Sequence, residues 1–285
     1  MAAGTHFRDL VATERPLVLP GAHDALSALL IRDAGFKAYF IGGFPVAGAR
    51  HGLPDIGLLG QGEFEAAYRD ITAVSDLPVL VDADNGYGDV KNVVHLVRSY
   101  ERLGAQAIFF EDQGSPKRCG HMAGKVLVPA EEMEARIRAA ASERLDPRTF
   151  LIARTDAREV LGLDEALRRG ERYLRAGADG LFIEAPQTLE EMARIPRELP
   201  ALHVANMLEG GRTPLLAPAE LDRLGFRILL YGISLLMHAA KTMQAVLADI
   251  ASGEFRLRGQ GMGFDAYKRL VGFDRWSAIE DRYRA

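Results

Sequence analysis

The chain has 285 residues, of which 48% are hydrophobic and 26% charged, a balance typical of a folded globular protein and not of a disordered or collagen-like one. Its net charge of -4 gives no electrostatic reason to expect nucleic acid or an anionic membrane as a partner. The single cysteine, Cys119, excludes an internal disulfide or a cysteine-rich zinc site and suits a reducing cytoplasm.

Neither the start of the chain nor its apolar stretches have the pattern of a targeting or membrane-spanning segment. The first 16 residues carry charges throughout and contain no apolar core, so we expect no signal peptide. The most apolar stretch runs from Ile228 to Ala240 and is shorter than the roughly 20 residues that span a bilayer. We therefore expect a cytoplasmic protein without a membrane partner.

A repeated unit runs along the chain, in which an amphipathic stretch ends at a glycine and an apolar run follows within a few residues. The clearest glycines are Gly35, Gly104, Gly177 and Gly225. A glycine just after a helix adopts a positive φ at little cost because it has no Cβ. The unit therefore predicts a helix, a glycine cap and then a strand.

Eight apolar runs have the character of buried parallel strands, since they are short, show no alternation and are separated by helical stretches. They are residues 17–19, 38–41, 79–82, 107–111, 150–154, 180–184, 202–206 and 227–231. Eight such units in about 250 residues predict a (β/α)8 barrel of the TIM type. We expect one domain over residues 1–285, with a C-terminal helical extension from about residue 250.

Polar residues gather where the third to seventh apolar runs end. They are Asp82, Asp84, Glu111, Asp112, Arg154, Asp156, Glu184 and Asn206. For Asp112 or Asp156 alone, a helix cap or a solvent-facing charge is the simpler interpretation. As a set, acidic groups at one barrel rim repel each other unless a cation lies between them, and hard oxygen ligands favour Mg²⁺ or Mn²⁺.

Two finer expectations follow for this rim. Asp82 and Asp84 are two residues apart, so on one strand they point to the same face and supply one direct and one water-mediated metal partner. Arg154 is then a bidentate anchor for a substrate carboxylate.

The segment after the fourth run crowds Lys117, Arg118, Cys119 and His121 into five residues between glycines. Cationic neighbours lower the pKa of a thiol and supply a proton donor and anion contacts, and glycines on both sides predict a mobile loop over an active site. A solvated basic loop with an incidental cysteine remains the alternative.

The sequence resembles the isocitrate lyase / phosphoenolpyruvate mutase superfamily. The resemblance rests on KRCGH at 117–121 after FFEDQ, on VDADNGYGD, LIARTDAR and GLPDIG, and it runs in order from about residue 18 to 231. It implies a (β/α)8 barrel whose eighth helix is exchanged between subunits, usually in a homotetramer built as a dimer of helix-swapped dimers. It also implies a Mg²⁺-dependent reaction on a small carboxylic acid.

The resemblance also implies roles for individual residues. Asp82 would bind Mg²⁺, and three further carboxylates would hold its waters: Asp55, Asp84 and Glu111. Cys119 would be the general acid on the gating loop, beside Lys117, Arg118 and His121. The substrate would be lined by Gly42, Gly43, Asp82, Gly120, His121, Arg154, Glu184 and Asn206.

The activity implied is cleavage of a carbon–carbon bond in a 2-substituted malate, another 2-hydroxy acid or an oxaloacetate-like acid, which yields an α-keto acid and a carboxylate. Two departures favour a small substrate: Ile41 precedes Gly42-Gly43 where lyases of the family carry serine, and Leu208 replaces a threonine. A phosphorus–carbon bond enzyme of the carboxyphosphonoenolpyruvate phosphonomutase type is the alternative, and a binding protein that kept the fold is a third.

Overall fold

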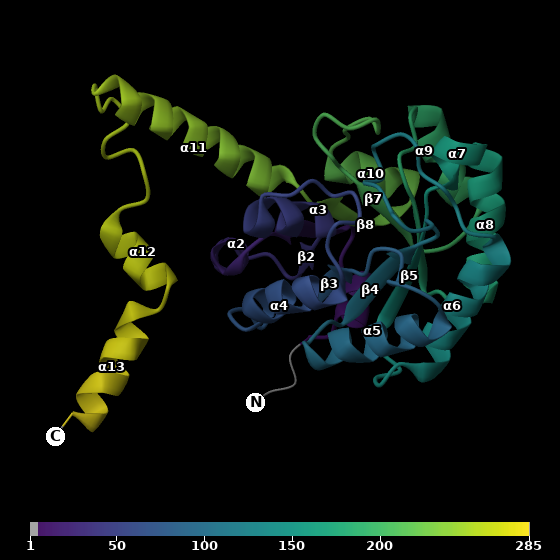
Figure 1. The fold of residues 1–285 in the computed structure, drawn as a ribbon, viewed down its shortest axis with the longest axis horizontal. Coiled ribbons are helices and arrows are strands. Elements are labelled where there is room, and N and C mark those ends of the chain that lie inside the picture. The colour runs from purple at the N-terminus through teal and green to yellow at the C-terminus, as the bar shows by residue number, and fades with distance from the viewer. Residues whose placement is uncertain (1–4, 285) are drawn as a thin grey trace.

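Eight parallel strands close into a barrel in the computed structural model, which describes residues 5–284 (Figure 1). The strands pair in chain order, and β1 closes the barrel by pairing with β8, with Leu17 opposite Ile228 and Leu19 opposite Leu230. The strands are β1 (Leu17–Ala22), β2 (Tyr39–Ile41), β3 (Val79–Asp82), β4 (Ala107–Glu111), β5 (Phe150–Thr155), β6 (Gly180–Ile183), β7 (His203–Asn206) and β8 (Phe226–Tyr231).

The predicted strands are all confirmed, and β3 and β4 have the predicted bounds. The largest difference is at β1, which continues three residues further, through Pro20 and Gly21 to Ala22. A Cβ on Gly21 would overlap the carbonyl of Gly232, so glycine is required where β1 runs closely past the end of β8.

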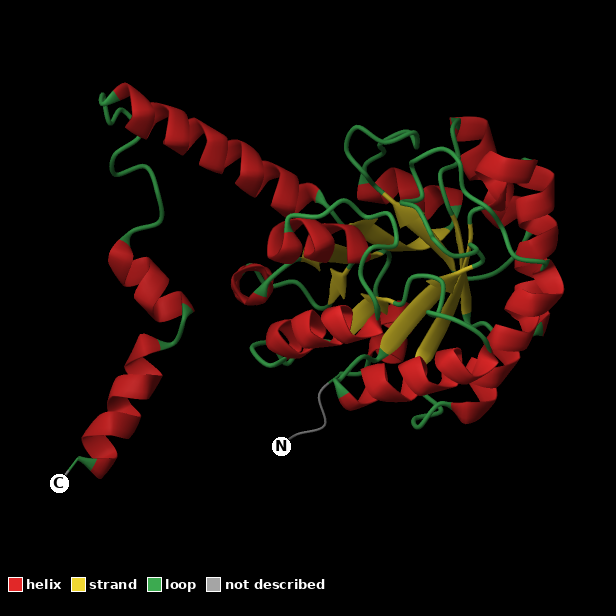
Figure 2. Ribbon diagram, viewed as in Figure 1, coloured by secondary structure: helices red, strands yellow, loops and turns green. Residues whose placement is uncertain are grey.

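Helices surround the barrel (Figure 2). The predicted glycine caps are confirmed: φ is +83° at Gly35, +92° at Gly104, +113° at Gly177 and +108° at Gly225. The helices are α1 (Phe7–Thr13), α2 (Ala25–Asp33), α3 (Gly43–Val46), the π-helix η1 (Ala47–His51), α4 (Gln61–Thr72), α5 (Val90–Arg102), α6 (Ala130–Glu143), α7 (Ala157–Leu161), α8 (Leu163–Arg175), α9 (Leu189–Glu198), α10 (Pro218–Leu224), α11 (Ser234–Ser252), α12 (Phe264–Leu270) and α13 (Phe273–Tyr283).

Aromatic side chains fill the inside of the barrel. The ring of Phe109 stacks on Phe40 with centroids 5.6 Å apart and meets the edge of Phe182 at 5.4 Å. Deeper in the same cluster, Phe7 of α1 contacts Phe150, with centroids 6.0 Å apart. Because barrel interiors are packed and not hollow, this layer gives the carboxyl ends of the strands a rigid apolar floor.

His203, at the start of β7, is fully buried and makes stability dependent on pH. Its Nε2–H donates to the Leu199 carbonyl oxygen at 2.6 Å, and Nδ1 has no hydrogen-bond partner among the described residues. Burial lowers the pKa of His203, although the bond to Leu199 opposes this shift. The folded state therefore binds the second proton less readily than the unfolded state, and stability falls as the pH drops below about 6.5.

We expect the His203→Gln variant to lose less stability than the wild type between pH 7.5 and 5.5, since glutamine still donates to Leu199 but does not titrate. The difference has an upper bound of about 1.4 kcal/mol per pH unit for one proton. Urea unfolding of both proteins at pH 7.5, 6.5 and 5.5 measures it. Parallel profiles for the two proteins would contradict the prediction.

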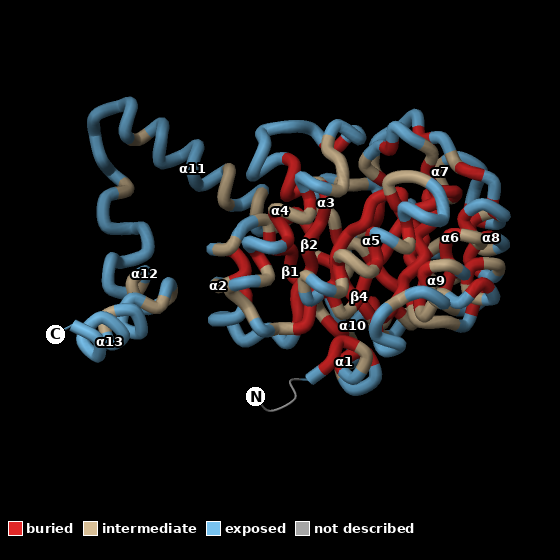
Figure 3. The backbone as a smooth tube through the Cα atoms, turned by 60° about the horizontal axis from the view of Figure 1, so that its bottom comes forward, coloured by how far each residue is buried: buried red, intermediate tan, exposed pale blue. Residues whose placement is uncertain are grey.

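The C-terminal helices project to one side of the barrel (Figure 3), where α11 contacts β1 and α12 contacts α2. The first of them, α11, follows β8, begins at Ser234 and buries none of its residues, and α12 and α13 lie beyond residue 250. The outer turns of α11 expose Met243, Leu247 and Ile250, and α13 exposes Trp276. Although α11 has 19 residues, no helix within residues 5–284 is both long and apolar enough to cross a membrane.

Candidate active site

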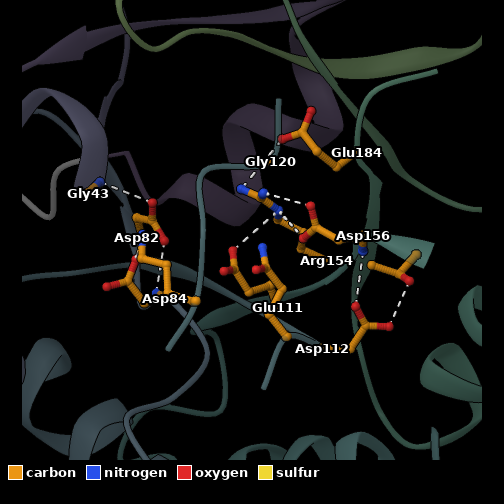
Figure 4. A network of polar contacts seen from close by, with 12 residues as sticks. Gly43, Asp82, Asp84, Glu111, Asp112, Gly120, Arg154, Asp156 and Glu184 are labelled. Atoms are coloured by element: carbon orange, nitrogen blue, oxygen red, sulfur yellow. Dashed lines mark hydrogen bonds and ion pairs between the residues drawn. The ribbon is translucent and has the colours of Figure 1, made fainter. Parts of the chain in front are cut away.

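Five neighbouring strands, β3 to β7, deliver polar side chains to one rim of the barrel. Asp82 ends β3, Glu111 ends β4 and Asn206 ends β7, while Arg154 lies one residue before the end of β5 and Glu184 directly follows β6. The carboxyl ends of parallel strands lie on the same side of a barrel, so these side chains meet around one cavity of about 50 Å³. Figure 4 shows Asp82, Glu111, Arg154 and Glu184 of this set.

Of the residues predicted to bind metal or substrate or to take part in catalysis, the structure brings all except Asp84 to the wall of this cavity. Those that line it are Gly42, Gly43, Asp55, Asp82, Glu111, Lys117, Arg118, Cys119, Gly120, His121, Arg154, Glu184 and Asn206. Asp84 lies behind the wall, where its Oδ1 is 2.5 Å from Nζ of Lys117. The placements fit the expected site, while the role of each residue remains a proposal.

A buried lysine lies between two carboxylates at one side of the cavity. Nζ of Lys117 is 2.5 Å from Oδ1 of Asp55 and equally close to Oδ1 of Asp84. Burial by itself lowers the pKa of Lys117, but Asp84 and Asp55 raise it well above its ordinary value. Lys117 is therefore a fixed cation here and does not exchange protons near neutral pH.

The spacing of Asp82 and Asp84 predicts that both lie on one strand, but in the structure a turn holds them close together. β3 ends at Asp82, and Asp84 has a left-handed backbone with φ of +47°. Oδ1 of Asp82 accepts the N–H of Asp84 at 2.9 Å, and its Oδ2 accepts the N–H of Gly43 at 3.0 Å. Gly43 therefore positions Asp82, so its N–H is already engaged and does not stand free for a substrate carboxylate.

Arg154 is surrounded by carboxylates from its own chain (Figure 4). Its Nε and Nη2 each lie 3.1 Å from an oxygen of Asp156, and Glu111 and Glu184 are each 3.4 Å away. Burial alone lowers the pKa of Arg154, but these carboxylates raise it well above its ordinary value. Arg154 thus has a fixed orientation, and its bidentate partner is Asp156 where the sequence had predicted a substrate carboxylate.

Asp112 and Asp156 are both fully buried, so the solvent-facing interpretation is wrong for each of them. Asp112 points away from the cavity, because successive residues of a strand face opposite sides and Glu111 faces inward. Its oxygens accept from Thr155 at 2.7 Å, Tyr173 at 2.8 Å and Arg169 at 3.0 Å. Asp112 is therefore part of the packing between the strands and α8 and not of the rim.

The segment that carries Cys119 lies across the mouth of the cavity. A Cβ on Gly120 would overlap the guanidinium of Arg154 and the side chain of Glu184, so only glycine allows this close approach. Nε2 of His121 is 3.1 Å from Oε1 of Glu184. Burial by itself raises the pKa of Glu184, but Arg154 and His121 lower it to about 2. Glu184 is therefore ionised and acts as a fixed acceptor.

The expected lowering of the Cys119 pKa is wrong, because burial raises the pKa of this thiol to about 11. The two neighbouring cations do not offset the burial: the ammonium of Lys117 is directed at Asp55 and Asp84, and Arg118 is exposed to solvent. At neutral pH Cys119 keeps its proton. It is suited to donate a proton and not to attack as a thiolate.

Several residues at the cavity were missed from the sequence. Phe109 and Phe182 form its floor. They lie two residues before Glu111 and Glu184, so the inward alternation of a strand could have identified them. Lys125 is buried beside Asp156, and no local pattern distinguishes it from a solvent-exposed lysine at the end of a loop.

The acidic side of the cavity fits a hard divalent cation. Among residues 5–284, no three acidic, histidine or cysteine side chains already converge as metal ligands would, and the Lys117 ammonium separates Asp55 from Asp84. Burial nevertheless raises the pKa of the four carboxylates Asp55, Asp82, Asp84 and Glu111, and most clearly that of Glu111. Oε1 of Glu111 is buried without a hydrogen-bond partner among the described residues. Lys117 and Arg154 supply two positive charges against these four carboxylates, so an excess of negative charge remains, which Mg²⁺ would balance.

Comparison with known proteins adds independent information. Residues 7–251 match the family described as phosphoenolpyruvate phosphomutase. The chain is 40% identical over 285 residues to 2,3-dimethylmalate lyase of Eubacterium barkeri, with 99% of each chain covered. It is also 40% identical over 238 residues to 2-methylisocitrate lyase of Bacillus subtilis (strain 168), which covers 84% of this chain and 78% of the relative.

Solved structures agree with the sequence matches. A crystal structure of 2,3-dimethylmalate lyase superposes with a TM-score of 0.91 at 31% identity, covering 98% of this chain and 94% of the other. Phosphonopyruvate hydrolase in complex with oxalate and Mg²⁺ superposes with a TM-score of 0.87 at 29% identity, covering 98% of each chain. The whole described fold, including its C-terminal part, therefore has counterparts of known structure.

Proposed function

This chain is an enzyme that belongs to the phosphoenolpyruvate phosphomutase family, and on that premise we propose that it is a Mg²⁺-dependent carbon–carbon lyase or hydrolase. Its substrate is a 2-substituted malate or a related 2-hydroxy acid, which would give an α-keto acid and a carboxylate, or an oxaloacetate-like acid, which would consume one water and give two carboxylates. The observation that carries the proposal is the position of Cys119, whose thiol pKa is raised by burial, in the wall of the same cavity as Arg154 and the acidic cluster. This cluster consists of Asp55, Asp82 and Glu111 in the wall and Asp84 behind it. Relatives named as lyases support it.

Asp82 would bind Mg²⁺ (or Mn²⁺) directly, and Asp55, Asp84 and Glu111 would hold its water ligands, because Mg²⁺ keeps several waters and takes one or two carboxylates. When bound, the ion would supply Lewis-acid polarisation of the carboxylate and hydroxyl oxygens of the substrate. The structure of the similar phosphonopyruvate hydrolase is a complex with oxalate and Mg²⁺, which supports the choice of metal but does not identify the ligands.

The residues of the chain would carry the proton transfers. In a 2-hydroxy acid, the hydroxyl proton leaves to a carboxylate of the acidic cluster, and the electron pair of the O–H bond forms the keto group as the carbon–carbon bond breaks. The electrons of that bond remain on the departing fragment, and Cys119 protonates its carbon. The proton on the carboxylate then restores the thiol, so the cycle is balanced. Arg154 and His121 would orient the substrate carboxylate.

The cavity favours a small acid. Its floor is apolar, with Phe109 and Phe182, and Leu208 lies on its wall. The two buried cationic side chains on the wall already have carboxylate partners, since Arg154 pairs with Asp156 and Lys117 with Asp55. A tricarboxylate would bring a third negative charge to a wall whose buried cations are already paired, whereas an alkyl substituent would pack on the floor.

The test is a panel of acids with and without Mg²⁺. It contains substituted malates, 2-methylisocitrate, oxaloacetate and phosphonopyruvate, with direct detection of keto acids and, for the phosphonate, ³¹P NMR. We expect a substituted malate to be cleaved with the highest kcat/KM and activity to disappear with EDTA. Turnover of the phosphonate alone would overturn the lyase proposal and favour phosphorus–carbon chemistry.

The C-terminal helices would pack on a second copy of the chain. An apolar groove of about 560 Å³ between α2, β1 and the start of α11 is open in the single chain and is lined by residues including Val18, Leu30 and Phe36. The helix α11 leaves the barrel next to this groove and exposes its own apolar side chains. Large exposed apolar surfaces mark interfaces. We therefore propose that this helix is exchanged between the subunits of a homotetramer. Light scattering after gel filtration would measure the mass of the assembly and so test the tetramer.

A further inference from the structure

Lys125 ends the segment that carries Cys119, and its side chain is completely buried. Its ammonium group donates to the carbonyl oxygen of Gly120 and lies 3.0 Å from Oδ1 of Asp156 and 2.8 Å from Oε2 of Glu159. One cation therefore joins three parts of the molecule: the segment over the cavity, the end of β5 and the helix α7. These contacts distinguish Lys125 from a lysine at the end of a loop whose ammonium group is hydrated by solvent.

A second set of contacts holds the same segment from the loop after β7. The backbone N–H of Arg212 donates to Nδ1 of His121 at 3.1 Å, and its Nη1 lies 3.0 Å from Oε1 of Glu159. A Cβ on Gly211 would come within 2.7 Å of Nδ1 of His121, so the loop is in tight contact with the segment. Glu159 thus receives Lys125 on one oxygen and Arg212 on the other.

These contacts continue to the cavity itself. Oδ1 of Asp156 accepts from Nζ of Lys125 and also from Nη2 of Arg154 at 3.1 Å, and Oδ2 accepts from Nε of Arg154. If the segment lifted and took Lys125 with it, Asp156 would lose a buried positive partner. The position of the segment and the orientation of Arg154 are therefore coupled through one carboxylate.

We propose that Lys125 and Arg212 are positioning residues that latch residues 117–125 over the cavity and, through Asp156, hold Arg154 in the orientation that meets the substrate. The role of Arg154 rests on the proposed function, whereas the latch is a property of the loop that can be measured without turnover. The latch acts at Gly120 and His121, the two residues that follow Cys119.

The single thiol of the chain provides the readout, since every labelled molecule reports Cys119. The variants are Arg212→Ala, which removes an exposed partner of Glu159, and Lys125→Met, which keeps the length of the side chain. The matched control is Arg158→Ala, because Arg158 lies on α7 next to Glu159 but pairs with Glu191 of α9.

We expect labelling by a disulfide reagent at pH 8 to be about two- to fivefold faster in Arg212→Ala, the range for an exposed ion pair. In Lys125→Met it should be at least about tenfold faster, because a buried pair contributes more than an exposed one. The control should label at the wild-type rate. With the substrate found in the acid panel, kcat of Lys125→Met should fall by at least about tenfold, with a smaller change in KM.

Wild-type labelling rates in both variants would overturn the latch. A lower thermal stability of Lys125→Met without faster labelling would also overturn it, since a merely structural role of Lys125 would give that result. Because Arg212 lies at the surface, its variant tests the latch even if Lys125→Met does not fold. Faster labelling in a protein that cleaves none of the acids would support the latch and reject the proposed function, so the two failures are distinguishable.

Discussion

Replacement of Cys119 by serine is expected to lower kcat by about 10²- to 10⁴-fold, the usual contribution of a general acid. A serine hydroxyl is a much weaker acid than a thiol, so protonation of the carbanion becomes slow even though the side chain keeps its shape. Binding of Mg²⁺ should not change, since no sulfur ligand is involved in the proposed site. Steady-state kinetics and Mg²⁺ titration of both proteins measure the two effects.

The control for Cys119→Ser is Met122→Leu, a substitution of an exposed side chain in the same segment. It should retain wild-type kcat, which separates the loss of the thiol from a general disturbance of the loop. If Cys119→Ser turned over at nearly the wild-type rate, Cys119 would not be the proton donor. The raised pKa of the thiol would then reflect burial alone.

The Asp82→Asn variant is expected to lose at least about 10³-fold in kcat/KM, because a directly bound Mg²⁺ contributes several kcal/mol to stabilising the transition state. Asparagine has the size of aspartate but supplies one acceptor oxygen in place of two, so it would bind the ion weakly and would also release either Gly43 or Asp84. Kinetics across a range of Mg²⁺ concentrations measure the loss.

Thermal unfolding gives a second readout for Asp82→Asn that does not require turnover. Mg²⁺ binds the folded state, so it should raise the Tm of the wild type in a concentration-dependent way and leave the Tm of the variant unchanged. Asp70→Asn, which removes the same charge from an exposed ion pair with Arg50, should still be stabilised by Mg²⁺. An equal rise in Tm for Asp82→Asn would show that the ion binds elsewhere.

Strand positions were predictable because the signal is local. A short apolar run that follows a helix-capping glycine predicts a buried strand at any position in the chain. The caps at Gly104 and Gly177 have the positive φ values that this prediction requires. The positions of the rim residues followed from the positions of the strands, since side chains at the carboxyl ends of all barrel strands lie on the same face of the barrel. Asp82 and Glu111 lie where that argument placed them.

Partner choice and charge state were not predictable in the same way. Asp112 and Glu111 are adjacent in sequence, yet one binds Arg169 behind the strands and the other lines the cavity, because a strand alternates its faces. Cys119 has two cationic neighbours in sequence, but the ammonium of Lys117 is directed at Asp55, which lies 62 residues earlier in the chain. Burial therefore determines the pKa of the thiol.

The sequence by itself determined the barrel, the acidic rim and the loop with its single thiol, because each depends on patterns within a few residues or on the geometry common to all parallel barrels. Only the tertiary structure decided which carboxylate holds Arg154, how Lys125 joins the loop to Asp156 and Glu159, and that Cys119 keeps its proton. Those properties depend on distances and burial created by segments far apart in the chain, and electrostatic interactions in a protein are governed by both.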